Sequence, residues 1–434
     1  MIIKRDYYLQ QLINAKHNGM IKVITGLRRS GKSFLLFELF NKHLIESGVD
    51  SNHIIKFAFD SQDSLDLIGE DLLEITLNKR KVNPIKFNNY IKEKITDDKK
   101  YYILLDEIQL LDSFEAVLNG YLRKQNLDVY VTGSNAKFLS KDVITEFRGR
   151  GWRIHVNPLS FKEFFDAFGK TKDEAYNEYV VYGGLPKLFE FSSNADKVKY
   201  LNSIFEETYL KDIIERNNVK NTDELGELLD FLSSSIGSLT NPTKLSNTFD
   251  SVKHVKIHTD TIKKYIEYFA DSFLISTPRR YDINGKGYIN SPLKYYFSDM
   301  GLRNARLNFR ELEQPRLMEN VVYNELVLRG YNVDVGVVEL YEQNITGKSV
   351  LKKTEVDFVC NQADKRYYIQ VAYTLDSEEK IMQEQKSLLR INDAFKKIII
   401  VKDSIKPHYN QYGVYIIGLY DFLLNINSMI NQGD

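Results

Sequence analysis

Cysteine is almost absent from the sequence, since Cys360 is the only one among 434 residues. A single thiol cannot form an internal disulfide, which excludes a disulfide-stabilised secreted domain and favours a reducing compartment. No run of 18 apolar residues occurs, and the start at Met1–Asp6 is not followed by a long apolar segment. The sequence therefore predicts neither a transmembrane helix nor a signal peptide, and we expect a cytoplasmic protein without a membrane partner.

Net charge is also absent, because 59 Lys and Arg residues balance 59 Asp and Glu residues. A general electrostatic attraction to nucleic acid or to a membrane surface is thereby excluded, and any such contact must come from a local patch. Hydrophobic residues make up 43% of the chain, which is ordinary for a globular protein. The length predicts about two to four domains.

The first third of the chain alternates short apolar runs with helical patterns. This alternation is typical of an α/β fold with a parallel sheet, because parallel strands need helical crossovers. We predict a five-stranded sheet from the runs Ile21–Thr25, Ile54–Phe59, Tyr101–Leu105, Val129–Thr132 and Trp152–Val156.

A glycine-rich turn lies between the first predicted strand and a helical segment. Residues 26–33 fit the pattern G-x-x-x-x-G-K-[ST], in which backbone N–H groups turn inward around phosphate oxygens. Lys32 would place a charge on the β and γ phosphates, and Ser33 would ligate Mg²⁺. The predicted nucleotide-binding residues are Gly26, Leu27, Arg28, Arg29, Ser30, Gly31, Lys32, Ser33 and Phe34.

Two adjacent carboxylates end the third predicted strand. Strand C-termini face the ligand crevice of a parallel sheet, so we expect Asp106 to hold Mg²⁺ and Glu107 to act as general base on the attacking water. The strand Val129–Thr132 ends in small polar residues, of which Ser134 would contact the γ-phosphate or the water, unless it forms an ordinary turn.

Three arginines, Arg148, Arg150 and Arg153, lie near the fifth predicted strand. One of them is a candidate arginine finger, acting in its own subunit or on a neighbouring one. The alternative is a solvated basic loop.

The middle of the chain contains an amphipathic helical pattern near Thr259–Phe269, followed by a strand-like run that would begin a wing. Residues 244–280 hold seven Lys or Arg and four Asp or Glu residues, so the local charge is positive. This excess is compatible with a DNA contact and equally with a helix used for packing or protein contacts.

Near the C-terminus, carboxylates follow the order of the PD-(D/E)xK nuclease core. Glu319 or Glu325 lies on a predicted helix, and Asp357 and Gln370 lie on two predicted neighbouring strands, Glu355–Cys360 and Tyr367–Tyr373. Periodicity does not choose between the two glutamates. Gln370 and Ala372 replace the acid and the lysine of the active pattern, so we expect no cleavage, unless Lys352, Lys353 or Lys380 supplies the amine.

Ordered motifs along the chain together resemble one known group, the prokaryotic AAA+ ATPases that pair an AAA domain of the AAA_14 type with a DUF4143 C-terminal region. The matching segments are Val23–Ser33, Leu104–Gln109, Val131–Ser134, Gly149–Arg150, Pro158–Phe164, Tyr182–Pro186, Tyr209–Ile213, Tyr296–Leu302, Glu319–Val322 and Glu355–Phe358.

The resemblance implies a P-loop NTPase core of the AAA+/ASCE class with a helical lid, a winged-helix domain and a PD-(D/E)xK-like α/β C-terminal domain. It favours Arg150 as the nucleotide-sensing arginine, through Gly149–Arg150. The expected limits are 1–157 for the ATPase core, 158–216 for the lid, 217–290 for the winged helix and 291–434 for the nuclease-like domain.

The leading interpretation is an ATPase that uses ATP and Mg²⁺ and couples its nucleotide state to double-stranded DNA or to a protein partner. A regulatory or defence-system sensor with little turnover is the first alternative, and an active nuclease is the disfavoured second one. The sequence leaves open a homo-oligomer and does not identify the partner.

Overall fold

The computed structural model describes residues 2–133, 149–253, 256–290, 292–343 and 349–429. The chain forms two compact units, and each is described by itself. The first comprises Met1–Pro158 with Leu185–Lys187 and Asp271–Phe273, and the second comprises Leu159–Gly184, Leu188–Ala270 and Leu274–Asp434. Among the described residues, every helix is too short or too polar to span a bilayer. The four predicted domain limits stay predictions.

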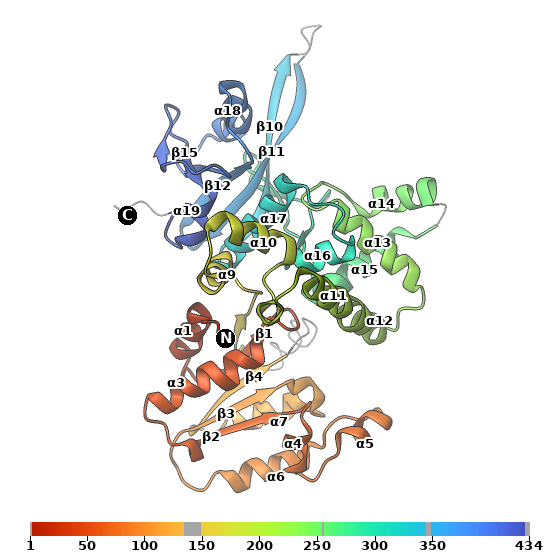
Figure 1. The fold of residues 1–434 in the computed structure, drawn as a ribbon, viewed down its shortest axis with the longest axis vertical. Helices are drawn as coiled ribbons and strands as arrows, with labels where there is room; N and C mark the ends of the chain where they lie inside the picture. The colour runs from red at the N-terminus through yellow and green to blue at the C-terminus, as the bar shows by residue number, and fades with distance from the viewer. Residues whose placement is uncertain (1, 134–148, 254–255, 291, 344–348, 430–434) are drawn as a thin grey trace. The chain divides into compact units, whose positions relative to one another are not determined.

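The first unit is built on a five-stranded parallel sheet, shown in the lower part of Figure 1. Its strands run in the order β2-β3-β4-β1-β5. All five predicted strands are confirmed, with ends that move by at most two residues. Their bounds are β1 (Ile21–Thr25), β2 (Ile54–Ala58), β3 (Tyr101–Asp106), β4 (Leu127–Thr132) and β5 (Gly151–His155).

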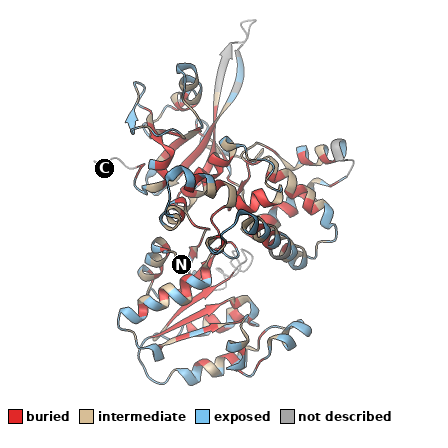
Figure 2. Ribbon diagram, viewed as in Figure 1, coloured by how far each residue is buried: buried red, intermediate tan, exposed pale blue. Residues whose placement is uncertain are grey.

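Helices cover both faces of this sheet, and strand β3 shows why. Its side chains alternate: Ile103 and Leu105 belong to one buried cluster and Leu104 to the other. Both clusters are buried, and Figure 2 shows the strands between them coloured as buried. Each fully buried aliphatic side chain stabilises the fold by roughly 1.5–3 kcal/mol. One face is covered by α1 (Asp6–Asn14), α2 (Lys32–Phe34), the π-helical segment η1 (Leu35–Phe40) and α3 (Asn41–Glu46); the other by α4 (Gln62–Asp66), α5 (Leu72–Leu77), α6 (Pro84–Lys94) and α7 (Phe114–Tyr121).

The second unit begins with helices. Both α9 and α10 open with a capping box, formed by Ser160 with Glu163 and by Thr171 with Glu174, which satisfies the free N–H groups of the first turn. The helices are α9 (Phe161–Phe168), α10 (Lys172–Tyr182), α11 (Asn194–Ile204), η6 (Phe205–Leu210), α12 (Lys211–Asn217), α13 (Thr222–Ser234), α14 (Pro242–Thr248), η7 (Phe249–Lys253) and α15 (Thr259–Asp271).

The strands after α15 pair with two different sheets. Strand β6 (Ile275–Ser276) pairs with β9 (Tyr296–Phe297), whereas β7 (Arg280–Asp282) and β8 (Gly287–Ile289) form a hairpin that joins the C-terminal sheet through β10. The helical order α13-α14-α15 fits the predicted winged helix, and the domain assignment stays a prediction.

The C-terminal part is an eight-stranded mixed sheet in the order β14-β15-β13-β12-β11-β10-β7-β8. The predicted neighbouring strands are confirmed, because β11 and β12 pair antiparallel with Phe358 opposite Ile369. The remaining elements are α16 (Met300–Arg306), α17 (Gln314–Leu328), β10 (Asn332–Gln343), β11 (Ser349–Gln362), β12 (Lys365–Ala372), α18 (Glu378–Gln385), β13 (Lys396–Val401), β14 (His408–Tyr409), β15 (Tyr415–Gly418) and α19 (Leu419–Leu424).

Candidate functional site

The glycine-rich turn lies at the carboxyl end of β1, where the sequence predicted it. Gly26 has φ of 136°, and a Cβ there would lie 2.0 Å from the Val156 carbonyl oxygen, so no other residue fits without a shift. Gly31 has φ of 92°, in the left-handed region that favours glycine. The two glycines thus permit the backbone to turn tightly before the helix begins.

The helix after the turn is continuous from Lys32 to Glu46, since α2, η1 and α3 follow one another in helical conformation. Its N-terminus therefore carries a partial positive charge and free N–H groups, which suit an anion such as phosphate. The side chains of Arg28, Arg29 and Ser33 are exposed, and Phe34 is 39% exposed. These side chains are accessible for a ligand, while Leu27 anchors the turn in the core.

Lys32 is buried at the start of this helix. Its Nζ donates hydrogen bonds to the carbonyl oxygens of Gly26, at 3.1 Å, and Leu27, at 3.0 Å. Burial lowers the pKa of Lys32 to about 8, although the carboxylates of Glu107 and Asp106 act in the opposite direction. The two carbonyl oxygens thus fix the ammonium inside the turn, where it is less solvated than the ammonium of a surface lysine.

Asp106 and Glu107 follow at the end of β3, and Thr132 at the end of β4 connects them. The Thr132 hydroxyl donates to Oδ1 of Asp106 and accepts from the Glu107 N–H at 3.1 Å. Thr132 is fully buried, so this link is shielded from water. The sequence placed Thr132 at a strand end but gave it no role, because only the β3–β4 pairing brings it to Asp106.

Glu107 adopts a left-handed conformation, with φ of 51°, which is uncommon for a residue other than glycine. Its Oε2 accepts a hydrogen bond from the Gln109 amide. Burial raises the pKa of Glu107, and burial together with Asp106 raises the pKa of nearby Asp60. A carboxylate with a raised pKa is a better proton acceptor at neutral pH than a solvated one.

Arg5 is a site residue that the sequence analysis missed. Its Nη1 donates to the Ser30 carbonyl oxygen at 2.8 Å and its Nη2 to the Asn157 carbonyl oxygen at 2.7 Å, so it fixes the backbone of the turn. The Ser30 hydroxyl is buried and has no hydrogen-bond partner among the residues that the structure describes. An orphaned hydroxyl inside such a turn fits a phosphate-binding cradle.

The two described arginines near β5 lie at different distances from the turn. The Arg150 carbonyl accepts from the Ile21 N–H at the start of β1, and about 13 Å of strand separate Ile21 from Thr25 beside the turn. Arg153 lies closer, with Nε 3.4 Å from the Thr25 hydroxyl. Arg150 therefore does not reach the turn of its own chain, and a finger role for it requires a neighbouring subunit.

His155 also contacts Thr25, with Nδ1 3.1 Å from its hydroxyl. Burial lowers the pKa of His155 to about 4, helped by the positive charges of Arg153 and Lys32, so the ring is neutral at physiological pH. Ser134 and Arg148 lie outside the described residues.

A second group of chemically active side chains lies in the second unit. Glu319 of α17 and Asp357 of β11 come together, and Lys294 and Glu355 join them. Lys294 Nζ lies 2.9 Å from Glu319 Oε1, 2.5 Å from Glu355 Oε1 and 3.7 Å from Asp357 Oδ1. Glu325 lies apart and pairs with Arg329 at 2.8 Å. The structure thus brings Glu319, and not Glu325, close to Asp357.

Gln370 lies beside this group, with Oε1 3.5 Å from the Asp357 N–H. Two of the lysines considered from the sequence pair with other carboxylates. Lys353 pairs with Glu339 at 2.6 Å, and Lys380 pairs at 2.7 Å with Glu384, whose other oxygen accepts from the Gln370 amide at 3.4 Å. The side chain of Lys352 is not described. The amine at the cluster comes instead from Lys294, far upstream in the sequence.

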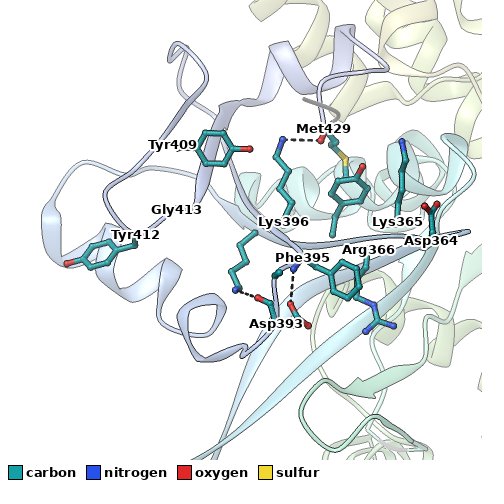
Figure 3. A pocket seen from close by; sticks show the side chains of 13 residues that line it. Asp364, Lys365, Arg366, Asp393, Phe395, Lys396, Tyr409, Tyr412, Gly413 and Met429 are labelled. Atoms are coloured by element: carbon teal, nitrogen blue, oxygen red, sulfur yellow. Dashed lines mark hydrogen bonds between the residues drawn. The ribbon is translucent and has the colours of Figure 1, made fainter. Parts of the chain in front are cut away.

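A pocket of about 640 Å³ opens beside strands β12 and β13. Figure 3 shows Tyr409 and Tyr412 on one side of it and Phe395 with Arg366 on another. The Lys397 ammonium donates to the Asp393 carbonyl, so a neutral oxygen holds it. Cations line the pocket together with aromatic rings, of which Phe395, Tyr409 and Tyr412 are exposed and Tyr367 is buried; the cations are Lys365, Arg366, Lys396 and Lys397. This combination suits phosphates and stacked bases.

Comparison with known families agrees with the first unit. Residues 18–165 match the family described as an AAA domain, which confirms the AAA part of the predicted resemblance. Residues 173–313 match a domain of unknown function, DUF8612. The predicted DUF4143 region is therefore not confirmed.

Two relatives match most of the chain. The chain is 35% identical over 432 residues to an uncharacterized protein of Haemophilus influenzae, covering 98% of this chain and 99% of the relative. It is 27% identical over 419 residues to protein MJ1544 of Methanocaldococcus jannaschii, covering 93% and 86%. A solved structure of a DNA polymerase III gamma subunit-related protein from Thermotoga maritima is similar at 13% identity and a TM-score of 0.27, covering 61% of this chain and 98% of that one.

Proposed function

The chain belongs to the same family as the Haemophilus influenzae protein, and from its AAA domain we propose that it is a Mg²⁺-dependent ATPase. The observation that carries the proposal is the position of Lys32, buried in the turn with the charges of Glu107 and Asp106 close enough to affect its pKa. A cation for phosphates and two carboxylates for metal and water thus meet at one edge of the sheet.

The residues of the turn fit a triphosphate and its metal ion. Gly26, Gly31 and the N-terminus of the helix offer backbone N–H groups, and Lys32 offers a charge for the β and γ phosphates. Ser33 and Asp106 are the residues that would hold Mg²⁺, which supplies charge neutralisation on the phosphates when bound. Thr132 fixes the Asp106 carboxylate in place for this role.

Glu107 is the residue that we assign as general base. Its backbone is fixed by Thr132 and its carboxylate by Gln109, so the side chain is oriented before a ligand arrives. A protein that only binds nucleotide, such as a sensor with little turnover, has no need for this buried and oriented carboxylate. A steady-state ATPase rate, measured with and without DNA, separates the two interpretations.

The first prediction concerns the pH dependence of ATP binding. The ammonium form of Lys32 binds phosphate, and the folded protein releases that proton around pH 8, below the usual lysine range. Affinity for MgATP should therefore be constant below pH 7 and fall about tenfold between pH 7 and pH 9, since each pKa unit changes the charged fraction by a factor of ten. Titration calorimetry at several pH values checks this.

The matched control is Lys32→Arg, which keeps its charge across this range and should bind with a flat pH profile. The same flat profile in the wild-type chain would show that Lys32 is not the group that titrates.

The partner of the ATPase has to be inferred separately. The exposed face of helix α15 favours DNA as that partner. Ile262, Tyr265, Ile266 and Phe269 bury one face, whereas Lys263 and Lys264 are exposed on the other. Lys263 pairs with Asp260 at 3.1 Å, which reduces but does not remove the local positive charge. We propose that these lysines contact DNA phosphates.

The second prediction is that Lys263→Glu with Lys264→Glu weakens binding to double-stranded DNA at least tenfold and flattens its salt dependence, because two phosphate contacts are lost. Fluorescence anisotropy with a labelled duplex at several salt concentrations measures both effects. The matched control is Lys365→Glu with Lys397→Glu in the pocket of Figure 3. Duplex binding that falls only in the pocket variant moves the contact from α15 to that pocket.

A neighbouring subunit is the source that we propose for an arginine finger. Arg150 is exposed and lies at the edge of the sheet away from its own turn, where a second copy of the chain can be reached. A homo-oligomer therefore fits this arrangement, and a nucleotide-dependent change in oligomeric state would support it.

A further inference from the structure

Lys294 is a buried cation that three carboxylate side chains of the second unit surround. Its side chain is 4% exposed, and its ammonium lies 2.5–3.7 Å from one oxygen each of Glu319, Glu355 and Asp357. These groups come from three places in the chain: the segment before β9, helix α17 and strand β11. A buried ammonium this close to three acidic side chains belongs to an ion-pair network of the interior and is not a surface ion pair.

Neighbouring groups donate further hydrogen bonds to two of the carboxylates. The Tyr296 hydroxyl donates to the same Glu319 oxygen at 2.6 Å, and the Val371 N–H donates to Asp357 Oδ2 at 2.8 Å. One oxygen of each carboxylate is thus directed at Lys294, whereas the second oxygen of Glu355 is buried without a hydrogen-bond partner among the described residues. Within the described part of the chain, no group of three or more His, Cys, Asp or Glu side chains is arranged to hold a metal ion.

A divalent metal would have to compete with the Lys294 ammonium for these oxygens. Mg²⁺ needs its oxygen ligands at about 2.0–2.1 Å, in near-octahedral geometry. A metal held by the Glu319 and Glu355 oxygens that contact Nζ would lie beside the ammonium, and the two cations would repel each other. The residues present therefore do not fit the metal that the nuclease-like fold implies.

We propose that Lys294 is the resident cation of this cluster, taking the place of a divalent metal ion and keeping the nuclease-like centre closed to metals. The lysine contributes one positive charge against three acidic side chains and ties three elements of the second unit together. It does not serve as the water-activating amine of a nuclease, because every carboxylate that would hold the metal is bound to it.

The protonation states of Lys294 and Asp357 agree with the assignment of Lys294 as the resident cation. Burial would lower the pKa of Lys294, but the carboxylates of Glu319, Asp357 and Glu355 raise it above the usual lysine value, so the amine stays charged. Burial, with the Glu319 charge, raises the pKa of Asp357 to about 8. One acidic proton and one ammonium thus reduce the excess negative charge near neutral pH.

The test is Mn²⁺ binding by the full chain, measured by electron paramagnetic resonance of free Mn²⁺. Wild type and Asp357→Asn should bind Mn²⁺ equally, because Asp357 is closed to metal. Lys294→Ala should gain one site at least tenfold tighter than any binding seen in wild type, and the double variant Lys294→Ala with Asp357→Asn should lose it. Sites elsewhere, including the P-loop, are common to all four proteins and cancel.

Two results would overturn the proposal. One is wild-type Mn²⁺ binding that disappears in Asp357→Asn, and the other is a folded Lys294→Ala chain that gains no site. Should Lys294→Ala unfold, recovery of its melting transition by Mn²⁺ supports the proposal, and absence of recovery counts against it. The wild-type comparison decides independently of that variant.

A second readout is cleavage of single- and double-stranded DNA and RNA in Mg²⁺ or Mn²⁺, with and without ATP. The wild-type chain should cut none of them. Metal-dependent cleavage that is lost in Asp357→Asn contradicts the closed centre, whatever happens to the ATPase of the first unit.

Discussion

Lys32→Ala is expected to reduce the affinity for MgATP at least about 100-fold, which corresponds to about 2.7 kcal/mol. The substitution removes the ammonium that Gly26 and Leu27 hold inside the turn and that would reach the β and γ phosphates. Charge-assisted hydrogen bonds of this kind contribute roughly 1.5–3 kcal/mol each, so the loss of two or more accounts for the effect. Binding is measured by titration calorimetry or with a fluorescent nucleotide.

The fold should survive this change. The pKa of Lys32 is lowered from its ordinary value to about 8, which means that the folded state disfavours the charged form. Below pH 8 the charged lysine therefore costs folding free energy, and alanine removes that cost. Thermal unfolding of the nucleotide-free variant should be at or above the wild-type temperature.

The matched control for this prediction is Lys42→Ala. Lys42 lies in α3 of the same continuous helix, is exposed, and pairs with Glu46 at 3.7 Å. It should bind MgATP as wild type does. Unchanged affinity in Lys32→Ala itself would remove the basis for the phosphate-binding assignment of residues 26–34.

Glu107→Gln should lower kcat by about two orders of magnitude or more, with MgATP affinity within about threefold of wild type. The amide keeps the shape of the side chain and loses the proton acceptor, while Lys32, Asp106 and Thr132 remain in place. The measurement is a steady-state phosphate-release assay together with nucleotide binding. Bound ATP that remains unhydrolysed on the variant would show that the substitution impairs hydrolysis and not nucleotide binding.

Glu93→Gln is the control for the carboxylate change, since Glu93 is exposed on α6 in the same unit. Its turnover should match wild type. If Glu107→Gln hydrolyses ATP at the wild-type rate, another residue activates the water, and Asp60 becomes the next candidate because partial desolvation and the Asp106 charge raise its pKa.

Much of the first unit could be predicted from the sequence because its signals are local. A buried parallel strand is an apolar run, and the turn after β1 needs glycine at Gly26 and Gly31 for backbone reasons. Asp106 and Glu107 could be found because they follow an apolar run directly. At these residues, the local sequence indicates both the backbone structure and the chemical role.

Other residues could not be predicted because their partners are distant in sequence. Arg5 contacts Ser30 and Asn157 across 25 and 152 positions, and nothing around Arg5 marks it as part of the turn. Thr132 reaches Asp106 only because β3 and β4 are neighbours in the sheet. The strand order β2-β3-β4-β1-β5 cannot be inferred from the sequence of any single strand.

The C-terminal cluster shows the same division. The sequence placed Glu319, Asp357 and Gln370 in a nuclease-like order and left the choice between Glu319 and Glu325 open, because both flank the same apolar helix face. The packing of α17 on the sheet decided it, turning Glu319 toward Lys294 and pairing Glu325 with Arg329. Lysines near Asp357 in sequence were considered, but the amine came from position 294.

By itself, the sequence determined the α/β class, the five strands of the first unit, and the turn with its lysine and two carboxylates. Each of these depends on neighbours within a few residues, through backbone conformation or the period of apolar side chains. The tertiary structure alone decided which arginines can reach the turn, what holds its backbone, and which cation fills the acidic cluster. Those contacts join segments that are far apart in the chain, and only the burial of the core brings them together.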